Sequence, residues 1–126
     1  MKKVLDTPSA PAAVGPYNHA IETTNLIFFS GQVPLDPKTG ELAGATIDVQ
    51  VKQSLDNVEA LLRDAGLTTD NVVKATIFLT NMDDFAVVNE AYAGRFREPY
   101  PARSTVAVAA LPKGALVEIE VIAVRS

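Results

Sequence analysis

The 126-residue sequence predicts an α+β fold in which one sheet carries two helices on a single face. Two segments, about 48–65 and 83–96, repeat apolar residues at three- and four-residue steps, which is typical of helices that cover a sheet. In the segments that flank these helices, successive residues alternate between two faces. One face is apolar and the other is polar or also apolar, which indicates strands. The predicted order is strand, strand, helix, strand, helix, strand, strand, and we expect residues 1–126 to form one domain.

The composition limits the classes of protein and of function. A hydrophobic content of 48% excludes a disordered chain, and a net charge of -4 without a basic run makes nucleic acid an improbable partner. The absence of cysteine excludes disulfides, thiolate nucleophiles and zinc–cysteine sites. Met1–Val4 lacks the apolar segment of a secretory signal, and no apolar run approaches membrane-spanning length. We expect a soluble cytoplasmic protein.

The N-terminal segment 7–16 is rich in proline and small residues, which predicts an extended, irregular lead-in. Tyr17 follows it and either lines a pocket or plugs an edge of the core, the latter being the usual role of a lone tyrosine. His19 is the only histidine, and without a second His or Cys nearby it makes a poor metal site.

The first two strands, 19–22 and 26–31, are expected to form a hairpin around Thr23–Asn25. The second strand ends in Ser30 and Gly31. A glycine at that place lets another group approach the backbone, but the pair is equally consistent with a strand that simply turns into a loop.

The first helix is expected to end at Ala65, because Gly66 and Leu67 supply a left-handed stop with an apolar contact. Its apolar stripe consists of Val51, Leu55, Val58, Leu62 and Ala65. A strand follows, with Val73, Ala75, Ile77 and Leu79 on one face. The second helix is expected to start at Asn81 or Asp83 and to turn Phe85, Val88, Tyr92 and Phe96 inward. Asn89 lies close to this inner stripe, where a polar residue needs a partner.

The last two strands, about 101–106 and 117–124, are predicted to pair as antiparallel neighbours around the turn 111–114. The closing strand carries Glu118 and Glu120 on one face, together with apolar side chains. A carboxylate there costs free energy unless it is paired, hydrated or functional. Arg103, at the start of the preceding strand, is either a surface charge or an anion-binding group, and Glu118 is either a structural partner or a functional acid.

Both faces of the predicted sheet are largely apolar, as shown by the neighbours Phe28 and Phe29 in one strand. Two helices can cover only one of these faces. No further segment of the chain is available for the other face, so we expect self-association through it.

Six short motifs along the chain together resemble one family. They are Gly15-Pro16-Tyr17, Ser30-Gly31-Gln32-Val33-Pro34, Gln53-Ser54-Leu55-Asp56-Asn57-Val58, Phe85-Ala86-Val87-Val88-Asn89, Pro101-Ala102-Arg103-Ser104 and Glu118-Ile119-Glu120. Each motif is weak alone, but in this order and spacing they resemble the RidA (YjgF) family of reactive enamine/imine deaminases, over residues 10–125.

The resemblance implies a chorismate-mutase-like α+β protomer and a homotrimer with clefts between its subunits. It implies hydrolysis of 2-imino acids and their enamine tautomers, such as 2-iminopropanoate and 2-iminobutanoate, to 2-keto acids and ammonia. It implies neither a cofactor nor a metal.

By position, Arg103 matches the family's carboxylate-binding arginine and Glu118 the acid that holds or activates water. Thr105 stands where the best-known members have cysteine, and its backbone carbonyl is implied to help fix that water. Residues matching those that line or support the cleft are Tyr17, Ser30, Gly31 and Asn89.

Two other functions remain open at this point. One is a binding protein that uses the same arginine to hold small 2-keto or other carboxylates without turnover. The other is RNA cleavage, which has been attached to family members. The sequence argues weakly against it, because the chain lacks a basic patch and has one histidine.

Overall fold

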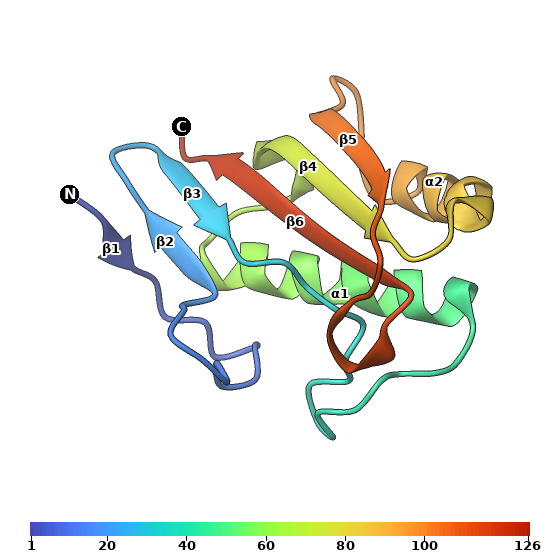
Figure 1. Cartoon of the computed structure of the whole chain (residues 1–126). Coiled ribbons are helices and arrows are strands. Elements are labelled where there is room, and N and C mark those ends of the chain that lie inside the picture. Colours follow the sequence, from blue (N-terminus) through green and yellow to red (C-terminus); the bar gives the residue numbers. More distant parts are fainter.

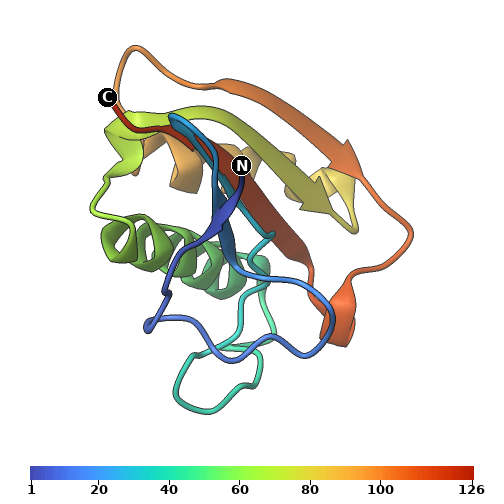
Figure 2. The same ribbon diagram turned by 90° about the vertical axis from the view of Figure 1, so that its left-hand side faces the viewer.

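The computed structural model describes residues 1–126 and shows a sheet packed against a layer of helices (Figure 1). The sheet has six strands in the order β1-β2-β3-β6-β4-β5. The strands are β1 (Lys3–Val4), β2 (Ala20–Glu22), β3 (Leu26–Phe29), β4 (Val72–Leu79), β5 (Ala102–Ala107) and β6 (Val117–Val124). The helices are α1 (Ile47–Asp64) and α2 (Phe85–Ala93), with short 3-10 turns at Thr69–Asn71, Met82–Asp84 and Pro112–Gly114. Both helices lie on one side of the sheet (Figure 2), which confirms the predicted α+β layering.

The core lies between α1 and the central strand β6. In β6 the residues alternate between buried and half-buried along the whole strand, with the buried set facing the helices. The predicted apolar stripe of α1 is buried, from Val51 to Ala65. Gly66 has a φ of 78°, and the N–H of Leu67 donates to the carbonyl of Leu62 at 2.8 Å. This left-handed stop confirms the predicted end of the first helix.

Helix α2 is shorter than predicted, because it ends at Ala93 and not near Phe96. Gly94 caps it, and a glycine lowers the helix propensity at this point. Tyr92 and Phe96 are nevertheless buried as expected, whereas Phe85 is 39% exposed and lies outside the core.

The predicted hairpin between the last two strands is wrong. β5 pairs in parallel with β4, and β6 pairs antiparallel with β3 on one side and with β4 on the other. Helix α2 connects β4 to β5, and such a crossover places the second strand parallel to the first. The connection 108–116 is much longer than a hairpin turn, so it does not force its flanking strands to pair. β6 therefore enters the centre of the sheet, where its apolar face is buried.

One residue of the third predicted strand lies on the other face. The pairing of β4 with β6 shifts between Val72 and Lys74, which is a β-bulge. As a result Val72 is 5% exposed and belongs to the core, while Val73 is 42% exposed.

The sheet face away from the helices is uncovered, as the two apolar faces of the sequence predicted. Phe28 on β3 and Val106 on β5 are each 43% exposed on this face, and Glu118, Glu120 and Ile122 lie between them on β6. We refer to it as the open face. None of the helices combines the length and the apolar character that crossing a membrane requires.

Candidate functional site

Arg103 lies on β5 and faces the helical side of the sheet. Its Cα partner on β4 is the core residue Ala75, and its guanidinium carbon lies 4.8 Å from the ring centroid of Tyr92 and 5.8 Å from that of Phe85. Arg103 takes part in none of the ion pairs of the chain, which all involve Arg95, Arg97 or Arg125. Its charge is therefore available to an anion from outside the chain.

A pocket surrounds this arginine. It is lined by Asn89, Tyr92, Ala93, Tyr100, Pro101 and Arg103. Phe85, Asn89 and Tyr92 are spaced at i, i+4 and i+7, so α2 presents all three on one side. The planar fork of a guanidinium binds a carboxylate through two parallel hydrogen bonds, which makes this a suitable pocket for a small carboxylate.

Tyr92 forms the buried part of this pocket. It is 5% exposed, and its ring stacks on Phe96 with centroids 4.2 Å apart. Burial raises the pKa of Tyr92, and the nearby charge of Arg103 opposes the rise. Tyr92 is thus neutral and presents a ring to Arg103 rather than a negative charge.

Glu118 lies on the opposite face of the sheet, above Gly31. A Cβ placed on Gly31 would overlap Oε2 of Glu118 and would lie 2.8 Å from its Cδ. Gln32 fixes this contact, because its N–H donates to the carbonyl of Ile119 at 2.8 Å and its carbonyl accepts the N–H of Ile119 at 3.2 Å. The carboxylate of Glu118 thus occupies the space that the missing side chain of Gly31 leaves.

The proton affinity of Glu118 is higher than that of an ordinary glutamate. Burial raises the pKa of its carboxyl, and the negative charge of Glu120 raises it further. A carboxylate of this kind accepts a proton more readily than an exposed one, which is what a general base requires.

The other predicted site residues divide between the two faces. Asn89 is exposed and lines the pocket of Arg103. Thr105 pairs with the core residue Ile77, so its side chain also faces the helices, and its Oγ1 is buried without a partner. Ser30 donates through Oγ to the carbonyl of Asn18 at 2.6 Å.

Tyr17 is 44% exposed, so the expectation that it plugs the core is wrong. It lines a hollow together with Gly31, and its ring meets that of His19 edge-on, with centroids 5.6 Å apart. His19 is half-buried, with Nε2 2.7 Å from the carbonyl oxygen of Pro11. Since a carbonyl only accepts, Nε2 carries the proton.

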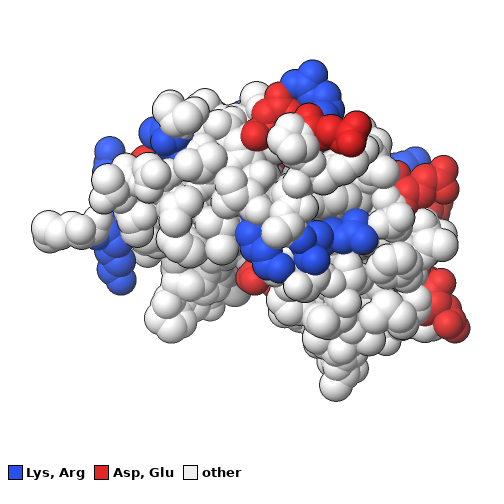
Figure 3. All heavy atoms as spheres, turned by 90° about the horizontal axis from the view of Figure 1, so that it is seen from above, with Lys and Arg blue, Asp and Glu red and all other residues white.

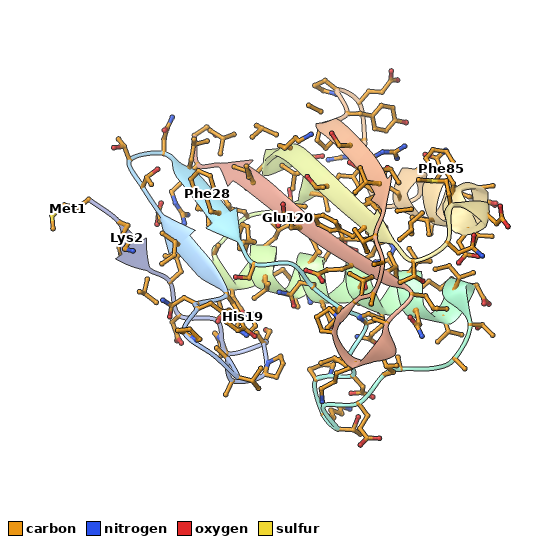
Figure 4. The ribbon with its side chains drawn as sticks, in the orientation of Figure 1. Met1, Lys2, His19, Phe28, Phe85 and Glu120 are labelled. Carbon is orange, nitrogen blue, oxygen red and sulfur yellow. The ribbon has the colours of Figure 1, made fainter.

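One copy of the chain does not bring Arg103 and Glu118 together. Arg103 contacts α2 on the helical side, whereas Glu118 projects from the open face. Figure 4 labels one neighbour of each residue: Phe85, whose ring lies beside Arg103, comes from α2, whereas Glu120, which shares its strand face with Glu118, comes from β6. The predicted site residues therefore form two separate groups, one around Arg103 and one around Glu118.

Comparison with known proteins matches residues 7–125 to the family model described as endoribonuclease L-PSP. The chain belongs to the RidA (YjgF) family. It is 48% identical over 128 residues to the 2-iminobutanoate/2-iminopropanoate deaminase of Escherichia coli K12, covering 99% of both chains. It is 47% identical over 125 residues to a RutC family protein of Pyrococcus horikoshii, again with 99% of both covered.

Solved structures of RidA relatives share the fold. RidA from an Antarctic Psychrobacter species superposes with a TM-score of 0.91 at 44% identity, over 97% of this chain and 98% of the other. TdcF of Escherichia coli, solved with bound serine, has a TM-score of 0.91 at 43% identity, over 98% and 99%. The resemblance inferred from the six motifs is thereby confirmed at the level of the family.

Sequence reasoning missed the contribution of the second helix to the pocket. Phe85 and Tyr92 were assigned only to the core, yet both rings lie beside Arg103. The spacing of Phe85, Asn89 and Tyr92 was a usable signal, because it places two aromatic rings on the same side of the helix as a predicted site residue.

Proposed function

We propose that this RidA family member hydrolyses reactive 2-imino acids and their enamine tautomers to 2-keto acids, with release of ammonia. Its substrates are short compounds such as 2-iminopropanoate and 2-iminobutanoate. The observation that carries the proposal is that Arg103 lies unpaired in an aromatic pocket while Glu118, a carboxyl with a raised pKa, lies above Gly31. A relative that is 48% identical in sequence carries the name of this activity. TdcF was solved with bound serine, which also bears a carboxylate.

In this proposal Arg103 binds the carboxylate of the substrate. The two hydrogen bonds of the guanidinium fix the orientation of the adjacent C=N carbon, and such positioning is a large share of catalysis. Asn89 and Tyr17 line the space on either side of the reacting group.

Glu118 acts on the water. It accepts a proton as the water oxygen attacks the imine carbon, and it returns protons to the nitrogen as the C–N bond breaks and ammonia leaves. The backbone carbonyl of Thr105 helps to hold the water. Gly31 and Ser30 keep the neighbouring strand end close to Glu118.

The complete site requires two copies of the chain. Because Arg103 and Glu118 lie on opposite faces of one sheet, a small substrate reaches both only where the pocket of one protomer meets the open face of another. The homotrimer implied by the family provides such contacts and covers the exposed apolar side chains of the open face. The proposed activity therefore depends on assembly of the protomers.

The test is an assay in which 2-iminobutanoate is generated in situ by a threonine dehydratase and the imine that has not been hydrolysed is trapped by semicarbazide as an adduct. We expect the wild-type protein to accelerate hydrolysis, which is measured as slower formation of the adduct. Arg103→Ala is expected to abolish the acceleration and Arg103→Lys to lower it strongly, because an ammonium cannot form the paired hydrogen bonds. Turnover by Arg103→Ala at the wild-type rate would refute the assignment.

The same assay separates a binding protein from an enzyme. Binding of 2-ketobutyrate without any acceleration would favour a carboxylate-binding role.

Ribonuclease activity, which the name of the family model suggests, receives little support from this chain. The one histidine has Nε2 at a carbonyl and Nδ1 buried, and one face of the molecule shows lysines and arginines only in small groups among large uncharged areas (Figure 3).

A further inference from the structure

The guanidinium of Arg103 is placed by aromatic rings instead of carboxylates. Tyr92 lies at 4.8 Å and Phe85 at 5.8 Å, within the distance at which a ring face attracts a cation. The arginines that form ion pairs are held by carboxylates: Arg95 by Asp56 and Glu59, Arg97 by Asp70, and Arg125 by Glu22. Arg103 thus has a different environment from the arginines that serve in ion pairs.

This environment suits a ligand-binding arginine. An acidic neighbour would occupy the N–H donors of the guanidinium and would compete with the carboxylate of a ligand. A ring attracts the cation through its π face and provides no oxygen or nitrogen acceptor for the guanidinium, so the N–H donors of the arginine remain available. A flexible arginine also loses side-chain entropy when it binds, and a side chain already held in place loses less of it.

The two rings are held to different degrees. Tyr92 is buried and stacked on Phe96, so the protein core fixes its position. Phe85 is 39% exposed at the start of α2, where a large apolar side chain gains little from burial. Its contact with Arg103 gives an aromatic residue at this place a role that burial does not give it.

We infer that Phe85 and Tyr92 are positioning residues that hold the guanidinium of Arg103 ready for the carboxylate of the substrate. The inference rests on the proposed function of Arg103 as the carboxylate-binding group. It predicts that the rings affect ligand binding through their π faces, and not through their volume or through the hydroxyl of Tyr92.

The experiment compares ring-removing with ring-preserving variants of the full-length protein. The ring is removed, but apolar volume is retained, in Phe85→Leu and Tyr92→Leu. The ring itself is preserved in Phe85→Tyr and Tyr92→Phe. Titration with 2-ketobutyrate is expected to give a Kd about threefold to tenfold higher for each leucine variant, the range of a partly desolvated cation–π contact. The ring-preserving variants are expected to stay near the wild-type Kd, and KM for the imine is expected to follow the same order.

A second measurement does not depend on activity. The Nε–H resonance of Arg103 in a nitrogen–proton NMR spectrum is assigned by its loss in Arg103→Ala. We expect Phe85→Leu to shift this resonance, because the ring current of Phe85 is lost. We also expect the Arg103 side chain to become more mobile, because the ring no longer restrains it. Phe85→Tyr should leave the resonance near its wild-type position.

The outcomes separate this inference from the proposed function. If Arg103→Ala loses ligand binding while both leucine variants bind as the wild type does and the resonance is unchanged, the positioning role is refuted and the carboxylate-binding role stands. If Arg103→Ala binds 2-ketobutyrate as tightly as the wild type, the proposed function itself fails. A leucine variant of Tyr92 that does not fold leaves the test to Phe85, whose exposed side chain contributes little to the core.

Discussion

At Gly31 the space left by a missing side chain is filled by the carboxylate of Glu118. Gly31→Ala is therefore expected to displace this carboxylate, to lower turnover strongly and to cost about 1–3 kcal/mol of stability, as overpacking does. Urea unfolding and the imine assay measure both effects. Gly94→Ala is the matched control, because its Cβ would make only ordinary contacts; we expect it to stay within about 1 kcal/mol of the wild type. An alanine at 31 that changes neither quantity would contradict the packing.

Glu118 gives a prediction with a defined sign. Its native pKa is raised by burial and by Glu120, so the folded chain holds the proton more tightly than the unfolded chain does. Stability then falls as the pH rises from the unfolded value of about 4.3 through the native pKa. We expect Glu118→Gln to be at least as stable as the wild type at pH 7 in thermal unfolding, with the difference vanishing below about pH 4.

The same shift affects activity. If Glu118 is the general base that we propose, it must be ionised to act, so we expect the wild-type rate to fall on the acid side of a pKa that lies above that of an ordinary glutamate. Glu118→Gln should lose most turnover and should no longer show this acid limb in a pH–rate profile. A variant that retains the limb would assign it to another group.

Single residues were predictable to the extent that strand alternation and the family motifs determine them. The alternation in 117–124 places Glu118 opposite the core, as the structure shows. The shared side of Phe85 and Tyr92 on the second helix was predictable from their spacing. Their contact with Arg103 was not, because it depends on the pairing of β5 with β4, which brings Arg103 beside α2.

At the scale of elements, the start of β6 is fixed by a side chain of α1. Gln50 is 2% exposed, accepts the N–H of Leu116 at 2.8 Å through Oε1, and donates through Nε2 to the carbonyl of Gly44 at 2.9 Å. Gln50→Leu should leave two polar backbone groups without partners and cost about 1–3 kcal/mol for each group that stays buried. Denaturant unfolding checks this, and an unchanged midpoint would show that water replaces both bonds.

The elements themselves were mostly predictable, but their pairing was not. The stripe of α1 and its glycine stop are local signals, and both are confirmed. The position of β6 between β3 and β4 depends on the crossover through α2 and on contacts far apart in the sequence. The turn residues at 111–114 favoured a hairpin between the last two strands. The crossover through α2 instead places β5 parallel to β4, and β6 pairs with β4 on the other side.

At the scale of the whole molecule, the open face connects fold and function. Two helices leave Phe28 and Val106 exposed on the same face as Glu118, so the face that needs a partner also carries the proposed catalytic acid. We expect sedimentation analysis to show a trimer. Phe28→Asp should weaken the trimer and lower activity at the same time, because a charge on this face opposes apolar burial. A fully active monomer would contradict the shared site.

The most direct measurement of that shared site is subunit complementation. Arg103→Ala and Glu118→Gln are each expected to be inactive alone, and their mixed trimers are made by co-expression with different tags and two-step purification. If Arg103 of one subunit works with Glu118 of the next, each mixed trimer has both intact residues at one of its three sites, so the purified mixed trimers should recover roughly one third of the wild-type activity. A mixed trimer no more active than its two parents would contradict the account.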